Sequence, residues 1–327
     1  MPFQGQARAN LQGAAIALLA FALFSGHDAL VKYLGGSYAP FQIVFFSVLL
    51  SFPLATLMLV QDRTDANLRP RRPGWTALRS AAAALTGVSA FYAFSTLPLA
   101  QVYAILFATP LLITVLSIPV LGEVVRLRRW AAVVVGMGGV LVVLRPGAAP
   151  LEAGHLAALL AACGAATAAI VVRKIGQEER PIVLMLYPML TNVVLMGAIL
   201  PFVYRPVAGL DLAALGLIAA LAFAASLLMI LAYTRGEAVV VAPMQYSQIV
   251  WATGYGALFF GERLDLWTAL GALIVIASGL YILLREGQGA ASTHRPVLRT
   301  RSRPETGTYL RIGPLIRTLR GADDDAR

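Results

Sequence analysis

A short run of amide and aromatic side chains in the last third of the chain has the composition of a surface for a flat, hydrogen-bonding molecule. Gln248, Trp251 and Tyr255 recur at helical spacing, so a helix presents them on one stripe. Amides donate and accept hydrogen bonds, which suits a uracil-like or pteridine-like edge, and aromatic rings offer faces for stacking. The candidate ligand-binding residues here are Gln248, Trp251, Tyr246 and Gln245. Hydrogen bonding between helices, with aromatic packing, is the alternative.

A second polar group lies inside an apolar run near the N-terminus. Asp28 and Lys32 are four residues apart with the acid first, the favourable order for an ion pair within one helix. His27 points about 100° away from Asp28 around such a helix. Unpaired charges are costly in apolar surroundings, so these residues form either a coupling site for a proton or ligand, or an anchoring ion pair. Both interpretations stay open.

Aromatic and proline residues in two further runs extend the candidate site. Tyr103 and Phe107 share a helix face at spacing four, and Tyr92 approaches the same zone. We place all three among the ligand-binding candidates, with packing as the alternative. Pro110 and Pro243 each free a backbone carbonyl and bend a helix, which favours either a gating hinge or a static kink.

Composition predicts what kind of element holds these residues. Hydrophobic residues make up 59% of the chain and charged residues 13%, whereas soluble domains are about half apolar and about a quarter charged. The composition therefore excludes an ordinary soluble enzyme and a disordered chain. The single cysteine, Cys163, excludes a disulfide framework and a cysteine-cluster metal site. We expect no metal and no cofactor.

Ten apolar runs, each near the ~20 residues of a membrane-spanning helix, follow one another along the sequence. Backbone groups in lipid must bond within their own segment, and the runs lack the alternation of a β-barrel strand, so we expect helices. The runs cover 11–33, 41–60, 76–97, 101–121, 130–146, 153–172, 182–203, 211–233, 239–260 and 266–284.

The positions of Lys and Arg predict the orientation. With the N-terminus inside, the inner loops carry Arg8, Arg63, Arg69, Arg71, Arg72, Arg126, Arg128, Arg129, Arg173, Lys174, Arg180 and Arg235. The outer loops carry only Arg145, Arg205 and Arg263. This bias predicts that both termini are cytoplasmic. It also explains the net charge of +10 without nucleic-acid binding, and we expect no nucleic-acid partner.

An internal repeat divides the chain. The segment 93–123 lines up with 232–262 at an offset of 139 residues. This predicts two five-helix halves, 11–146 and 153–285, followed by a basic tail, 286–327, expected to be cytoplasmic and disordered. Five is odd, so the second half is inverted relative to the first, as in transporters with alternating access.

The repeat also pairs individual residues. Phe107 corresponds to Tyr246, and Thr109 to Gln248. Glu123 corresponds to Glu262, each directly after a glycine at a helix end. We expect both glutamates to be structural, with local partners such as Arg126 and Arg263.

Several motifs resemble a known family. They are Leu97–Ala100, Leu121–Glu123, Gly136–Val140 and Phe260–Glu262. Together they resemble the EamA repeat of the drug/metabolite transporter superfamily, over about residues 11 to 285. The resemblance implies an all-α integral membrane protein of ten transmembrane helices, arranged as two inverted-topology five-helix repeats around a central cavity.

A narrower resemblance concerns the first two helices. Ser25–Lys32 followed by Phe41–Ser47 is similar to bacterial riboflavin transporters of this superfamily. Gln42, in the second of these segments, therefore joins the candidate substrate-binding residues.

The resemblance implies a secondary transporter of the bacterial inner membrane that works by alternating access. Riboflavin uptake is the preferred substrate hypothesis; an exporter of amino acids or other metabolites, or an S-adenosylmethionine-type transporter, is the alternative. An enzyme is disfavoured because the sequence lacks Walker, His-Glu-x-x-His, Gly-x-Ser-x-Gly and Gly-x-Gly-Asp motifs. A sensor is disfavoured because no sizeable soluble domain is present. The expected partners are a small-molecule substrate and the lipid bilayer; a homo-oligomer stays open.

Overall fold

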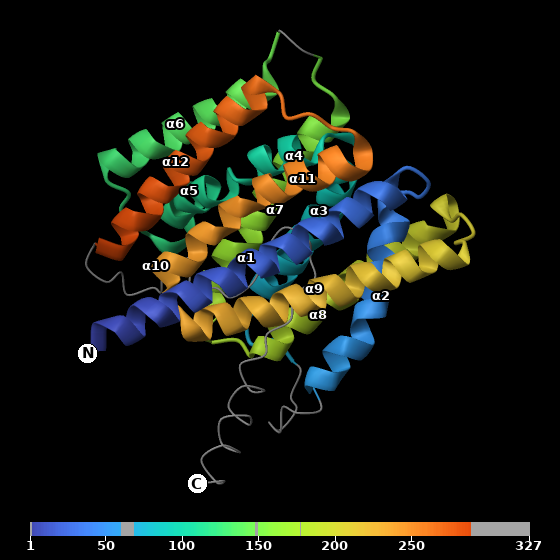
Figure 1. Cartoon of the computed structure of the whole chain (residues 1–327). Helices are drawn as coiled ribbons and strands as arrows, with labels where there is room; N and C mark the ends of the chain where they lie inside the picture. Colours follow the sequence, from blue (N-terminus) through green and yellow to red (C-terminus); the bar gives the residue numbers. More distant parts are fainter. Residues whose placement is uncertain (1, 60–68, 148–149, 177, 289–327) are drawn as a thin grey trace.

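The computed structural model describes residues 2–59, 69–147, 150–176 and 178–288, and within these ranges it contains helices and no strands (Figure 1). In chain order the helices are α1 Pro2–Gly35, α2 Pro40–Leu59, α3 Pro73–Thr96, α4 Leu99–Leu106, α5 Thr109–Leu121, α6 Leu127–Leu144, α7 Ala153–Ile175, α8 Pro181–Val203, α9 Gly209–Arg235, α10 Ala238–Val241, the 3₁₀ helix η1 Ala242–Ser247, α11 Gln248–Phe260 and α12 Leu266–Gln288. The all-helical prediction is confirmed for these residues. The predicted tail, 286–327, lies almost entirely outside them.

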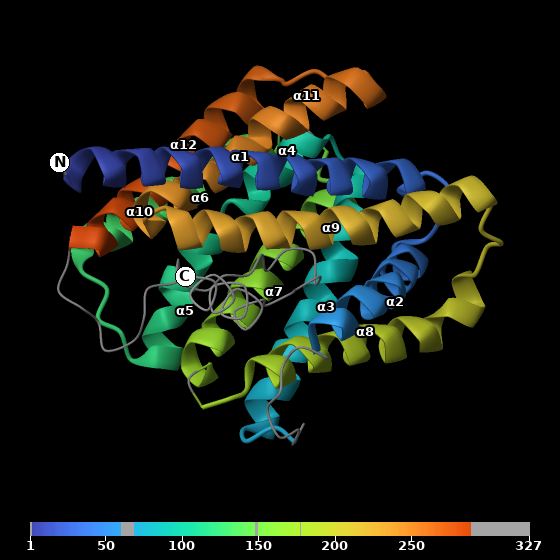
Figure 2. The same ribbon diagram turned by 60° about the horizontal axis from the view of Figure 1, so that its bottom comes forward.

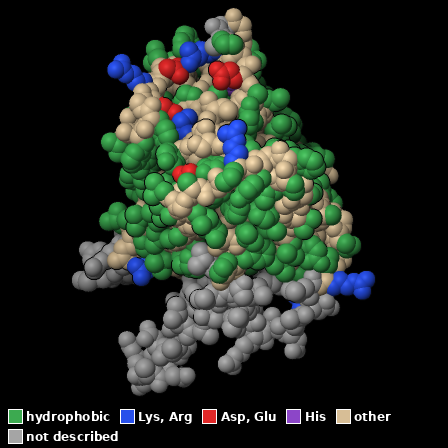
Figure 3. Space-filling model, turned by 90° about the vertical axis from the view of Figure 1, so that its right-hand side faces the viewer, with side chains coloured by type: hydrophobic (Ala, Val, Ile, Leu, Met, Phe, Trp, Pro, Cys, Tyr) green, Lys and Arg blue, Asp and Glu red, His purple; other side chains and the backbone are tan. Residues whose placement is uncertain are grey.

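Seven segments in the described part of the chain are long and apolar enough to cross a membrane. They are Ala9–Gly35, Leu99–Leu121, Leu127–Leu144, Ala153–Ile175, Val183–Val203, Gly209–Arg235 and Leu266–Leu283. Figure 3 shows a broad apolar surface beneath a group of charged side chains at the upper end of the molecule. A wide apolar surface is compatible with lipid, and the chain is a multi-pass membrane protein.

Three of the ten expected runs do not meet the same criterion. Only Pro40–Pro53 of α2 is described with its side chains, a stretch that is apolar but shorter than a membrane span. Helix α3 is rich in Ala, Ser and Thr and contains Arg79, which lowers its mean hydropathy. The run 239–260 is divided into α10, η1 and α11. For α3 and for the run 239–260 the shortfall therefore has a local cause, in composition and in helix continuity respectively.

Two of the expected spans are interrupted at corresponding positions. The first changes from α4 to α5 at Phe107 and Ala108, and the second changes from η1 to α11 at Ser247 and Gln248. Pro110 lies in the first turn of α5, where a missing backbone N–H costs little. Pro243 occupies the same place in η1. The prolines thus begin new segments rather than bending continuous helices.

Each half of the chain packs mainly against the other half. Helix α1 lies along α9 and α3 lies along α7, while α6 pairs with α12 and α2 with α8 (Figures 1 and 2). Glycines permit the closest of these contacts. A Cβ atom on Gly271 of α12 would lie 2.6 Å from the carbonyl oxygen of Gly139 on α6. Small residues thus bring the two backbones together, as is typical of membrane helices.

Candidate functional site

Five buried polar side chains from three helices meet near the interrupted segments, and we name them the central polar cluster. They are Ser25, His27 and Asp28 of α1, Tyr103 of α4 and Gln248 of α11. His27 Nδ1 lies 2.8 Å from Asp28 Oδ1, and the Tyr103 hydroxyl donates to Asp28 Oδ2. Gln248 Nε2 and Ser25 Oγ donate to the Tyr103 hydroxyl at 3.3 and 3.4 Å. Tyr103 therefore links α1, α4 and α11 through one oxygen atom.

A chain of aromatic rings lies beside the cluster. The ring of Tyr103 is 5.4 Å from that of Phe94 on α3 and 6.1 Å from that of Phe107, measured between centroids. Phe107 in turn meets Tyr246 edge to face at 5.1 Å and 77°. These rings connect the two interruptions, so the predicted correspondence of Phe107 and Tyr246 is a direct contact. Tyr103 supplies both a ring and the hydroxyl at the centre of the polar cluster.

Three buried polar atoms near the cluster have no hydrogen-bond partner among the described residues: His27 Nε2, Thr109 Oγ1 and Ser247 Oγ. Thr109 begins α5 and Ser247 ends η1, so both hydroxyls lie at the interruptions. A buried polar atom without a partner costs about 1–3 kcal/mol. Water or a bound polar molecule at this place would remove that cost.

The Asp28 carboxylate decides what chemistry the cluster can perform. It is fully buried, and a negative charge in that environment needs a proton, a cation or hydrogen-bond donors. His27 contacts one of its oxygens and Tyr103 the other. The cluster can therefore hold a positively charged or hydrogen-bond-donating molecule, or bind and release a proton.

Tyr246 points toward α12 instead of into the polar cluster. A Cβ atom added to Gly279 would overlap its hydroxyl oxygen and lie 3.1 Å from its Cζ atom. The glycine therefore makes room for this phenol, and the ring remains available to the aromatic chain only through its edge contact with Phe107.

Replacing Gly279 with alanine is expected to destabilise the protein by about 1–3 kcal/mol, because the methyl group must displace Tyr246. Adding Tyr246→Phe should restore most of the loss by removing the oxygen that clashes. Thermal unfolding in detergent measures both effects. Gly254→Ala on α11 is the control, since nothing lies within 4 Å of its added Cβ. An equal loss in the double variant would show that the overlap is not the cause.

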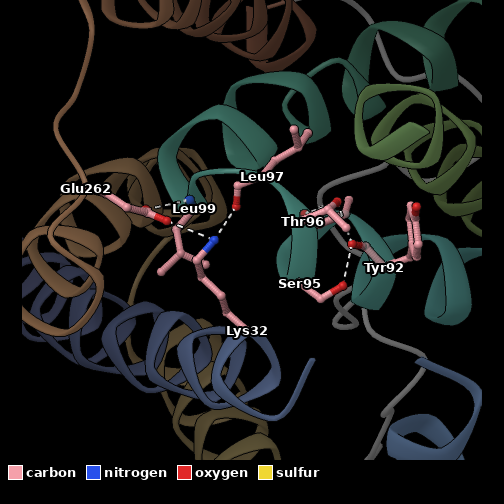
Figure 4. Close-up of polar contacts among 8 residues, drawn as sticks. Lys32, Tyr92, Ser95, Thr96, Leu97, Leu99 and Glu262 are labelled. Atoms are coloured by element: carbon pink, nitrogen blue, oxygen red, sulfur yellow. Dashed lines mark hydrogen bonds and ion pairs between the residues drawn. The ribbon is translucent and has the colours of Figure 1, made fainter. Parts of the chain in front are cut away.

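Lys32 does not pair with Asp28. Its Nζ atom lies 2.9 Å from Glu262 Oε1 and donates to the Leu97 carbonyl oxygen at 2.6 Å (Figure 4). The other oxygen of Glu262 accepts the Leu99 N–H at 2.9 Å. The ion pair considered within the first helix is therefore replaced by one across the molecule, because Asp28 is already bonded to buried donors one turn away.

The two corresponding glutamates also have other partners than expected. Glu123 pairs with Arg173 of α7 at 2.6 Å, and Glu262 pairs with Lys32. Arg126 and Arg263, the local partners considered from the sequence, are not the residues in these two ion pairs. Each glutamate thus contacts the first helix of the other half, which the spacing along the sequence could not reveal.

The remaining candidates lie outside the cluster. Both amide atoms of Gln42 bond to the backbone of Arg205, at 2.7 and 2.9 Å, so this side chain fastens a loop. Tyr92 and Trp251 are exposed, at 36% and 37%. The backbone carbonyl of Tyr92 accepts hydrogen bonds from the hydroxyls of Ser95 and Thr96 (Figure 4). Gln245 is half-buried on η1.

Comparison with known proteins agrees with a helical membrane transporter. Residues 11–145 and 152–284 match the model of the EamA-like transporter family. One similar protein is an S-adenosylmethionine uptake transporter of Rickettsia prowazekii, 26% identical over 87% of this chain and 96% of the relative. A second is the pseudopaline exporter CntI of Pseudomonas aeruginosa, 28% identical over 81% and 94%.

Two further comparisons concern the predicted subgroup and the fold. A riboflavin transporter of Rhizobium johnstonii is 26% identical over 68% of this chain and 74% of the relative. A solved crystal structure has a TM-score of 0.54 at 18% identity, covering 87% of this chain and all of that one, which shows a shared fold. The family predicted from the motifs is confirmed.

Proposed function

Because this chain belongs to the EamA-like transporter family, we propose that it is a secondary transporter that moves a small polar metabolite across the bacterial inner membrane. We also propose that the chain crosses the membrane ten times, as two halves, 11–146 and 153–285, of inverted topology. The relatives in the comparisons are transporters, which indicates that the chain is not an enzyme.

The packing supports the inverted arrangement. Exchanging the two halves converts the α1–α9 contact into the α7–α3 contact, and the α1–α11 contact into the α7–α5 contact. The α6–α12 and α2–α8 contacts convert into themselves. A pseudo-two-fold axis produces such a pattern, and in transporters with this architecture the substrate site lies where the repeats meet.

The central polar cluster is the proposed substrate site, and the burial of Asp28 is the observation that carries the proposal. An ionisable side chain at 0% exposure within a membrane segment is typical of a functional site, and three buried polar atoms near it have no partner among the described residues. Asp28 and His27 are also the proposed coupling residues. Tyr103, Gln248 and Phe107 supply donors and a ring face for a flat substrate.

Other candidates keep secondary places in this proposal. Tyr92, Trp251 and Gln245 would contact the substrate only along its path. Pro110 and Pro243 would be hinges because each lies in the first turn of a segment, α5 and η1 respectively.

Two substrates follow from the relatives. S-adenosylmethionine carries a fixed positive charge, which a buried carboxylate such as Asp28 would stabilise. Riboflavin, the preferred hypothesis from the sequence, carries no fixed charge, but its ring suits Gln248 and the aromatic chain. The carboxylate is the distinguishing group, and it favours S-adenosylmethionine.

Uptake of both labelled compounds by bacteria producing the protein tests the proposal. We expect saturable S-adenosylmethionine uptake above an empty-vector control, and weaker riboflavin uptake. Uptake of riboflavin without uptake of S-adenosylmethionine would make riboflavin the substrate instead. If neither compound enters the cells and neither accumulates in inside-out vesicles, both substrate assignments are wrong.

A further inference from the structure

Two ion pairs join the halves of the chain at corresponding positions. In the first, which we name the Lys32 pair, Lys32 of α1 contacts Glu262 after α11. In the second, the Arg173 pair, Arg173 of α7 contacts Glu123 after α5. Each pair thus links the first helix of one half to the fourth segment of the other. Their side chains are largely buried, at 14% and 16% in the Lys32 pair and 5% and 17% in the Arg173 pair.

The same backbone turn places both glutamates. Gly122 and Gly261 each end a helix in the left-handed conformation, with φ of 71° and 65°. The next N–H then bonds back to the carbonyl oxygen six residues earlier, at 3.3 Å for Glu123 and 2.9 Å for Glu262. This helix-ending motif fixes the direction in which each glutamate leaves the helix. The two glutamates therefore occupy equivalent positions because the backbone has the same conformation at both helix ends.

Basic side chains also bond to backbone oxygens at each end. Lys32 donates to the Leu97 carbonyl at 2.6 Å, and Lys174, next to Arg173, donates to the Val120 carbonyl at 2.7 Å. In Figure 4 the Lys32 ammonium lies between Glu262 and the turn from α3 to α4. Each end therefore holds one carboxylate ion pair and one bond from a basic side chain to a backbone carbonyl, on the turn after α3 at one end and on α5 at the other.

The two pairs lie at opposite ends of one membrane segment, with the cluster between them. The Lys32 pair contacts Leu97 and Leu99, where the segment Leu99–Leu121 begins. The Arg173 pair lies at the other end, because its Glu123 comes just after this segment ends. A segment of this length spans about 30 Å, the thickness of the hydrocarbon core. Tyr103 and Thr109 lie between these ends, so each pair lies on one side of the cluster along this segment.

We propose that the Lys32 pair and the Arg173 pair are the two gates of the transporter, each closing the central polar cluster toward one side of the membrane. The inference rests on the proposed transport function. Alternating access requires that one side open while the other stays closed. Breaking either pair frees the end of α11 or of α5, and the interruptions at Ser247 and Ala108 let that end move independently of the rest of its span.

Thiol labelling tests this inference without a substrate. Cys163 is the single native cysteine, so Cys163→Ser provides a cysteine-free background. Thr109→Cys then places a thiol midway between the pairs, at a buried side chain of similar size. A membrane-impermeant maleimide is added to inside-out or right-side-out vesicles, and the labelling rate is measured from each side.

Removing each pair is expected to favour opposite sides. Glu262→Gln should raise the labelling rate from the side where α1 ends about fivefold or more, the change in population that a loss of ~1 kcal/mol produces. It should also lower labelling from the other side. Glu123→Gln should give the reverse. Lys32→Gln should match Glu262→Gln, and combining the two should add little, since partners in one interaction are not additive.

The outcomes separate this inference from the transport proposal. The gates would be contradicted if Glu262→Gln and Glu123→Gln change the labelling rate equally from both sides, or if neither variant changes it. This holds even if the protein transports its substrate. Opposite changes in labelling rate, in a protein that transports no substrate, would support the gates and contradict the proposed transport function. Glu178→Gln is the control, because it removes an ion pair with Arg72 that is more than half exposed. Total thiol labelling after denaturation shows that each variant is present in equal amount.

Discussion

Replacing Asp28 with asparagine is expected to lower substrate transport about a hundredfold, because losing a buried charged partner costs several kcal/mol. Asparagine has the same shape, and its carbonyl can still accept the hydrogen bond from Tyr103. The variant should therefore fold and reach the membrane in normal amounts. Uptake rates at matched membrane levels, together with gel filtration in detergent, measure the two effects separately.

Asp211→Asn is a matched control for this result. Asp211, in the first turn of α9, also accepts a tyrosine hydroxyl, that of Tyr38 between α1 and α2, at 2.6 Å. The hydrogen bond with Asp211 and partial burial raise the pKa of Tyr38 above its ordinary value, so this donor stays protonated near neutral pH. Asp211→Asn should leave transport unchanged. Normal transport by Asp28→Asn would remove Asp28 from the mechanism.

Replacing Gly271 with valine is expected to prevent stable folding. Its Cβ atom alone would lie 2.6 Å from the Gly139 carbonyl oxygen, and the backbone of α6 cannot yield as a side chain can. Overpacking a close contact costs about 1–3 kcal/mol or more, and valine adds two further methyl groups. We expect loss of monodisperse protein in gel filtration and a lowered midpoint of thermal unfolding.

Gly138→Ala on α6, the helix that packs against α12, provides the contrast. A Cβ atom there meets nothing within 4 Å, so alanine should be neutral or stabilise the helix by up to about 1 kcal/mol. Stable Gly271→Val protein with the wild-type midpoint would contradict the close α6–α12 packing.

The sequence predicted the helices well because hydropathy and length are local properties. It did not predict where the fourth and ninth runs are interrupted, since Phe107 and Ser247 are not distinctive residue types. Pro110 and Pro243 signalled irregularity, but proline at the start of a segment and proline within a kinked helix look alike in a sequence. The interruptions depend on packing between the halves.

The sequence named four of the five residues that the structure brings together in the central polar cluster. Asp28, His27, Tyr103 and Gln248 were all candidates, because polar groups in apolar runs are conspicuous. The partner of Lys32 was wrong, since spacing along a helix cannot reveal that Glu262, 230 residues away, lies closer. Gln42 shows the converse problem: an amide looks the same in a sequence whether it meets a ligand or a backbone loop.

Substrate counterflow in liposomes tests the central claim most directly. Purified protein is reconstituted with unlabelled S-adenosylmethionine inside, and the entry of labelled S-adenosylmethionine is followed, with riboflavin examined in parallel. The account predicts transient accumulation of label by the wild type and by Asp211→Asn, and almost none by Asp28→Asn. Accumulation at the same rate by Asp28→Asn would contradict a transport path through the central polar cluster.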